Sequence, residues 1–174
     1  MNNALILRNL FRAIFLMMLQ VLVFQHINLG GGNFNYILVF VYPIFLMFLP
    51  MATPTWLLLI IGFFYGYCID TFIDTLGMHS AACVFSMFVR SFILGLVEPQ
   101  GGYKDGISPT RRQMGFPWFL RYAALFMLAH IFYFFCVEVF TLLYIGKIMM
   151  YTLPSFVISL VVVMIYSFLF DPVD

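Results

Sequence analysis

Residues 148–170 read IMMYTLPSFVISLVVVMIYSFLF and contain no charged residue. A helix needs about 20 mainly apolar residues to cross the hydrocarbon core of a bilayer. A second long apolar run covers residues 119–144. A β-barrel strand would instead alternate apolar and polar residues over roughly ten positions. These runs therefore predict membrane-spanning α-helices.

The composition of the whole chain agrees with a membrane protein. Its 174 residues are 64% hydrophobic and only 9% charged, whereas a soluble domain is about 45–50% apolar and about 25% charged. So few charges cannot cover a water-facing surface, and we expect a single transmembrane domain over residues 1–174. The net charge of +1 gives no broad basic field, so we expect no nucleic-acid partner.

Turn-forming residues divide the chain into about six predicted spans, which gives an all-α polytopic fold. Glycines 30–32 end the first span, Pro43 lies within the second, and Gly77 separates the third from the fourth. An interior proline is tolerated in a membrane helix when neighbours satisfy the freed carbonyl. A polar loop, about residues 98–117, precedes the fifth span. The predicted spans are residues 13–27, 36–49, 55–75, 79–97, 118–144 and 148–170.

The basic residues predict the orientation of these spans, because lysine and arginine collect in cytoplasmic loops. With six spans, the two termini and the 98–117 loop share one side. That side holds Arg8, Arg12, Lys104, Arg111, Arg112 and Arg121. We therefore expect both termini to be cytoplasmic. The basic residues of the loop suit anionic headgroups or a cytosolic partner, and a solvated connector explains them equally well.

Small and acidic residues form a stripe on the third span. Gly62, Gly66, Asp70 and Asp74 follow one another at intervals of four, so they share one helix face. Small residues at this spacing let two helix backbones approach closely. We expect the stripe, together with the following Gly77, to form a helix-packing or partner interface. His79 and Arg90 on the fourth span belong to the same predicted interface.

Arg90 lies well inside the fourth span. Ionised side chains within a membrane are costly and are candidates for function. One interpretation pairs Arg90 with Asp70. The other lets its long side chain extend to the cytoplasmic headgroups.

Polar residues of three spans predict a cluster near the outer surface: Asp70, Asp74, His79, His130 and Glu138. A metal site, a proton relay or a substrate pocket would use such groups. Buried hydrogen bonds that fix helix packing or a partner contact would use them equally well. No HExxH motif and no His/carboxylate pair at helical spacing occurs, so we expect no metal and no cofactor.

Motifs of known catalytic chemistry are also missing. There is no GxSxG sequence and no P-loop. The serines stand alone on apolar helices, where hydrogen bonding within the membrane is their usual role. The three cysteines lack ligand spacing and suit buried apolar positions. We therefore expect a protein that is not an enzyme.

Several of these segments together resemble one family. The sequence GFFYGYCID at 62–70, then LGMHSA at 76–81 and Arg90, resembles MreD, the rod shape-determining membrane protein. Pro99, Gly102 and Tyr103, then WFLRYA at 118–123, His130 and FCVEVF at 135–140, resemble its Bacteroidetes branch. The resemblance covers roughly Gly62–Phe140.

This resemblance implies a function. MreD-like proteins are non-enzymatic scaffolds in the bacterial inner membrane that take part in cell elongation, cell shape and peptidoglycan synthesis. They associate with the bitopic protein MreC, and through it with MreB filaments, RodA and a penicillin-binding transpeptidase. Their fold is similar to that of the substrate-binding subunits of energy-coupling-factor transporters.

That fold similarity supplies the alternative function, a vitamin- or metal-binding subunit of a transporter. Such subunits tend to carry the small-residue motif on their first helix, where an energising partner docks. Here residues 13–20 read AIFLMMLQ and lack the motif, which lies on the third span. A membrane enzyme is the third possibility, in which Asp70 or His130 would act with groups that the sequence does not identify.

Overall fold

The computed structural model describes residues 3–27, 37–103 and 108–170, and over these residues the protein is helical apart from its loops. Five helices are long and apolar enough to cross a membrane, the first together with the short turn that follows it. This confirms an all-α polytopic fold. The five long helices are α1 (Asn3–Leu22), α3 (Thr55–Ile73), α4 (Met78–Leu96), α6 (Phe116–Val139) and α7 (Ile145–Leu169). Four short elements complete the described helices: η1 (Phe24–His26), α2 (Pro43–Met47), α5 (Arg111–Met114) and η3 (Leu142–Tyr144).

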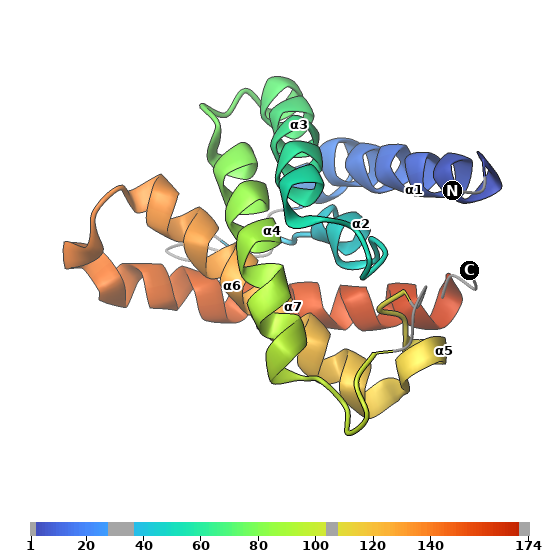
Figure 1. Ribbon diagram of the computed structural model, residues 1–174. Coiled ribbons are helices and arrows are strands. Elements are labelled where there is room, and N and C mark those ends of the chain that lie inside the picture. Colours follow the sequence, from blue (N-terminus) through green and yellow to red (C-terminus); the bar gives the residue numbers. More distant parts are fainter. Residues whose placement is uncertain (1–2, 28–36, 104–107, 171–174) are drawn as a thin grey trace.

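Both chain termini lie at the same end of the helix bundle, together with α5 (Figure 1). Two ring contacts hold this end together, between Phe15 and Phe170 at 6.3 Å and between Phe116 and Phe168 at 5.9 Å. We call it the terminal end. The α3–α4 turn and η3 lie at the opposite end, which we call the distal end. The sharing of one end by the termini and the 98–117 loop agrees with an even number of crossings.

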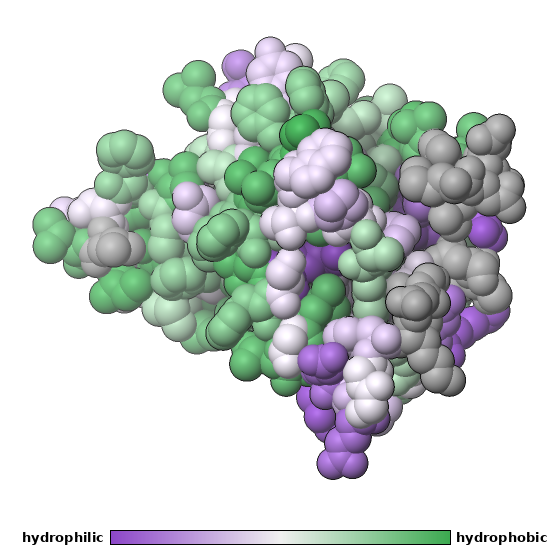
Figure 2. All heavy atoms as spheres, in the orientation of Figure 1, coloured by the Kyte–Doolittle hydropathy of each residue, from purple (hydrophilic) through white to green (hydrophobic). Residues whose placement is uncertain are grey.

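The surface suits a lipid environment. Figure 2 shows apolar residues over most of one face, with hydrophilic residues gathered at the terminal end over α5 and the segment after α4. Large apolar side chains are exposed along the long helices, including Phe63, Phe88 and Val161. In water such a surface would aggregate, whereas in hydrocarbon it costs nothing to expose.

The second predicted span is not a spanning helix, which corrects the expectation for residues 36–49. Residues 37–41 form neither a helix nor a strand, Tyr42 is a turn residue, and only Pro43–Met47 form a helix, α2. Pro43 explains the change, because proline is well placed at the first turn of a helix and disrupts the interior. We call residues 37–49 the central segment. Tyr36 lies outside the described residues.

The central segment lies inside the bundle and runs alongside α7. Every residue from Val39 to Leu49 is buried. Leu38 lies beside Ser155, while Phe48 contacts Tyr166 at 6.1 Å between ring centroids. From Ser155 to Tyr166, α7 rises about 16 Å, roughly half of a hydrocarbon core of about 30 Å. The segment therefore covers about half of that thickness inside the protein, in the place where a sixth helix was expected.

Two other boundaries differ from the predicted spans. Helix α6 ends at Val139 rather than Tyr144, because Phe140 adopts a left-handed conformation with φ of 54°. Helix α1 begins at Asn3, well before Ala13. The residues around Arg8 and Arg12 are thus helical, because polar residues do not break a helix that extends beyond the apolar core.

Candidate functional site

The buried polar side chains of the spanning helices converge on the central segment. A backbone that is neither helix nor sheet leaves its N–H and C=O groups unpaired, and at membrane depth these groups must find partners within the protein. Side chains from all five long helices contact the segment. We call these side chains, with the segment itself, the polar core.

Gln20, Ser155 and Ser159 bind the first half of the central segment, where the Leu38 N–H donates to the Ser155 hydroxyl at 3.1 Å. The side-chain amide of Gln20 donates to the Val39 carbonyl at 3.0 Å and accepts from the Val41 N–H at 2.8 Å. The backbone N–H of Phe40 donates to the Ser159 hydroxyl at 2.9 Å. The pairing of Gln20 resembles that of a neighbouring strand. Gln20 is not among the predicted site residues, although a side-chain amide inside an apolar helix is a signal that could have identified it.

Arg90 binds the other end of the central segment rather than Asp70 or the headgroups. Its side chain is 1% exposed. It donates to the Leu49 carbonyl, and its Nε donates to the Tyr122 hydroxyl at 3.1 Å. That hydroxyl in turn donates to the Met47 carbonyl at 3.1 Å. Met47 is the last residue of α2 and Leu49 lies two residues beyond it, so Arg90 brings positive charge to the C-terminal end of this short helix, which the helix dipole favours.

His130 is held at both ring nitrogens in the centre of the bundle. The Ser86 hydroxyl donates to the Ala82 carbonyl at 2.7 Å and therefore accepts from Nδ1 of His130, at 2.8 Å. Nε2 must then be the acceptor, and the Tyr42 hydroxyl donates to it at 2.7 Å. His130 is fully buried and neutral in this arrangement, with neither nitrogen left for a metal or a substrate.

Asp70 connects α3 to the start of α4. One carboxylate oxygen accepts from the Thr75 hydroxyl at 2.6 Å, the His79 N–H at 3.0 Å and His79 Nδ1 at 3.1 Å. The other accepts from the Ser80 N–H at 2.8 Å and the Ser80 hydroxyl at 2.5 Å. His79 and Ser80 lie in the first turn of α4, whose N–H groups have no partner within the helix. Asp70 thus caps α4 with a negative charge at its positive end.

The glycines of the stripe face α4, as expected for helix packing. A Cβ on Gly66 would lie 2.5 Å from the Ser80 Cα, so no side chain fits there. A Cβ on Gly62 would lie 3.0 Å from Met87 Cγ. Gly77 has φ of 81°, a conformation that favours glycine, and this conformation makes the turn into α4. The glycine face is covered by the protein itself, so it offers no partner surface.

Two of the predicted cluster residues lie outside the hydrogen bonds of Asp70. Asp74 is exposed at the C-terminal end of α3, in a left-handed conformation with φ of 59°. Glu138 is exposed near the end of α6. The five predicted residues therefore do not form one cluster: Asp70 and His79 form a helix cap, and His130 belongs to a separate site deeper in the bundle.

A small cavity opens at the distal end, next to the helix cap. Its volume is about 190 Å³. Its polar lining comes from Gln20, Gln25, Thr75, His79 and Glu138. The side-chain oxygen of Gln25 is buried without a hydrogen-bond partner in the described part of the chain. We call this space the distal cavity, and it is the part of the predicted outer cluster that remains accessible.

The 98–117 loop folds back onto the ends of α4 and α6. The Tyr103 hydroxyl donates to the Leu94 carbonyl, and the Trp118 indole N–H donates to the Val97 carbonyl, both at 2.7 Å. Thr110 caps α5 by accepting from the Gln113 N–H at 3.3 Å. Lys104 lies outside the described residues, and these contacts attach residues 98–103 and 108–117 to the terminal end.

In residues 3–27, 37–103 and 108–170, no three His, Cys, Asp or Glu side chains approach closely enough to hold a metal ion. Cys83 is buried and free, as expected for an apolar position. Comparison with known proteins found no matching family model, no matching curated protein and no matching solved structure.

Proposed function

We propose that this chain is a non-enzymatic scaffold of the cell-elongation machinery in a bacterial inner membrane, with both termini in the cytoplasm. Its partners would be an MreC-like bitopic protein and, through it, MreB filaments, RodA and a penicillin-binding transpeptidase. The resemblance of residues 62–140 to MreD supports this function, since it includes the glycine stripe, Asp70 and Arg90.

One structural observation supports a scaffold best: the buried polar groups hydrogen-bond to the protein's own backbone. Arg90 binds the Leu49 carbonyl, and Asp70 binds the N–H groups of His79 and Ser80. Groups used in this way hold a fixed shape. A catalytic acid or base must instead lie within hydrogen-bond reach of a substrate.

The distal cavity is the observation that favours the alternative, a ligand-binding transport subunit. Its volume of about 190 Å³ is below the roughly 300–1,000 Å³ of most ligand pockets. A vitamin would not fit without rearrangement of the surrounding helices. The size of the cavity thus favours the scaffold, whereas its polar lining favours binding of a small ligand.

Two separate experiments test the scaffold: depletion of the protein in its own cells, and affinity purification of the protein in mild detergent from cells that contain it. We expect rod-shaped cells to become round and an MreC-like chain to co-purify. Normal rods after depletion, or purification without any elongation partner, would contradict the proposal. Native mass spectrometry of the same sample would reveal a retained small molecule and so favour the transport subunit.

The variant Glu138→Gln separates the two functions. Glu138 lines the distal cavity and is exposed, so its loss should leave the fold intact. A scaffold carrying this change should restore rod shape to depleted cells as well as the unchanged protein does. A ligand-binding subunit should lose affinity for its ligand. Arg121→Gln, an exposed change outside the cavity, is the matched control.

A further inference from the structure

A cleft at the terminal end lies between the first half of α1 and the last turns of α7. Its volume is about 450 Å³. Two arginines and four aromatic residues line it: Arg8, Phe11, Arg12, Phe15, Tyr166 and Phe170. We call it the α1–α7 cleft. It borders the central segment, because Arg12 and Tyr166 both contact Phe48, and the resemblance to MreD does not cover it.

The two arginines place positive charge at two depths in the α1–α7 cleft. They are one helical turn apart, so their Cα atoms differ by about 6 Å along α1. Arg12 is 8% exposed; it donates to the Asn9 side chain at 3.3 Å, and its guanidinium lies 5.5 Å from the centre of the Phe48 ring. Arg8 is exposed at the rim.

The aromatic residues make the rest of the α1–α7 cleft apolar. Phe11 and Phe15 stack along α1 at 6.3 Å, and Phe15 contacts Phe170, the residue that follows α7, at the same distance. The rings of Tyr166 and Phe170 lie 5.3 Å apart. The Phe11 side chain is 71% exposed, although Phe15 of the cleft lies next to it. The cleft therefore combines a charged rim with a wall of rings.

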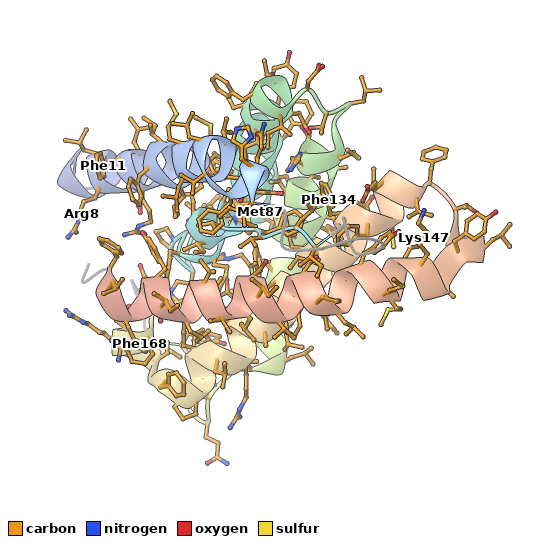
Figure 3. All side chains as sticks on the ribbon, turned by 180° about the vertical axis from the view of Figure 1, so that it is seen from behind. Arg8, Phe11, Met87, Phe134, Lys147 and Phe168 are labelled. Atoms are coloured by element: carbon orange, nitrogen blue, oxygen red, sulfur yellow. The ribbon has the colours of Figure 1, made fainter. Side chains whose placement is uncertain are left out.

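The position of the α1–α7 cleft matches the level of lipid headgroups. Figure 3 shows Arg8 and Phe11 at the same end of the molecule as Phe168, with Lys147 at the opposite end. Arg111 of α5 adds a third guanidinium at this end, 4.4 Å from the centre of the Phe168 ring. Hydrophilic residues collect at the same end in Figure 2.

We propose that the α1–α7 cleft binds one anionic phospholipid, with its phosphate at Arg8 and Arg12 and an acyl chain against Phe11, Phe15 and Phe170. Guanidinium groups bind phosphate oxygens in a bidentate manner. Basic pockets between membrane helices favour anionic headgroups over zwitterionic ones. Free phosphate carries no acyl chain and cannot contact the aromatic wall. The wall therefore favours an intact lipid over free phosphate.

Native mass spectrometry of the full chain tests this site. Detergent-solubilised protein is mixed with equal amounts of palmitoyl-oleoyl phosphatidylglycerol and the phosphatidylcholine with the same chains. We expect one phosphatidylglycerol molecule to be retained in preference. Arg8→Gln should weaken its retention about fivefold, and Arg8→Lys should weaken it less, because lysine keeps the positive charge but loses the bidentate contact. Phe11→Ala should weaken it as well, because the chain loses its apolar contact.

Matched controls distinguish the cleft from general attraction to a basic protein. Arg121→Gln removes an exposed charge of the same kind from α6, and Phe88→Ala removes an exposed ring from α4. Neither should change retention of phosphatidylglycerol. Equal retention of the two lipids would overturn the proposal, and so would equal losses in Arg8→Gln and Arg121→Gln. Displacement by inorganic phosphate at constant ionic strength would overturn the intact-lipid assignment.

Discussion

Asp70 shows how one carboxylate stabilises the contact between two helices. Its five hydrogen bonds reach Thr75, His79 and Ser80. Asp70→Asn replaces one acceptor oxygen with an NH₂ group, which cannot accept from the donors of Ser80. We expect a loss of about 3 kcal/mol of stability, since buried donors are left unpaired.

Thermal unfolding in detergent measures the effect of Asp70→Asn, and Asp74→Asn is its control. Asp74 is exposed one turn later on the same helix, so its change should stay within about 0.5 kcal/mol. A thiol-reactive dye can follow unfolding through buried Cys83, in a background where Cys68 and Cys136 are serine. Equal melting temperatures for the two variants would contradict the role given to the Asp70 cap.

Gly66 sets the distance between α3 and α4. Gly66→Ala places a methyl group 2.5 Å from the Ser80 backbone, which cannot move as a side-chain end can. We expect destabilisation of about 3 kcal/mol or more, at the upper end of the range for overpacking. Gly95→Ala is the control, because a Cβ there meets nothing within 4 Å. The same thiol assay should find Gly95→Ala unchanged or slightly more stable.

The sequence predicts these local features well because they depend on spacing. Gly62, Gly66 and Asp70 recur every four residues, and this period places them on the face that meets α4. The partners of Arg90 could not be predicted in the same way. They are the carbonyl of Leu49 and the hydroxyl of Tyr122, and backbone carbonyls leave no mark in a sequence.

At the scale of elements, the central segment depends on two serines of α7. Ser155 and Ser159 accept hydrogen bonds from the N–H groups of Leu38 and Phe40. The double change Ser155→Ala and Ser159→Ala leaves both N–H groups unpaired inside the protein. We expect a cost of about 1–3 kcal/mol for each, and faster hydrogen–deuterium exchange in residues 37–42.

Ser167→Ala on the same helix is the control for this double variant. Its hydroxyl donates only to the Met164 carbonyl of α7 itself, at 2.9 Å. Its removal should leave exchange in the central segment unchanged. Slow exchange in the double variant would mean that the packing of Val39–Leu49, rather than these hydrogen bonds, fixes the segment.

The central segment also shows why the second crossing could not be predicted. Apolar composition over residues 36–49 is equally consistent with a buried helix or a buried extended chain. The conformation of the segment depends on Gln20, Ser155 and Ser159, which lie far from it in sequence. Only their arrangement in space provides hydrogen-bond partners for a non-helical backbone inside the bundle.

At the scale of the whole molecule, the topology depends on whether the central segment crosses the bilayer between α1 and α3. The turn carrying Leu76 and the turn carrying Leu143 lie at the distal end, while Ala52 and Gln100 follow elements that return to the terminal end. If the central segment crosses the bilayer, the N-terminus shares a side with Ala52. If it does not, the two lie on opposite sides.

Single cysteines on a background without Cys68, Cys83 and Cys136 test this topology with a membrane-impermeant reagent. We expect Leu76→Cys and Leu143→Cys to react in intact cells, because both side chains are at least nine-tenths exposed at the distal end. Ala52→Cys, Gln100→Cys and a cysteine in an N-terminal tag should react only after the cells are permeabilised. Labelling of Ala52→Cys in intact cells together with a protected tag would show that the buried segment turns back within the membrane. The polar core would then line a re-entrant loop, and the even number of crossings would be wrong.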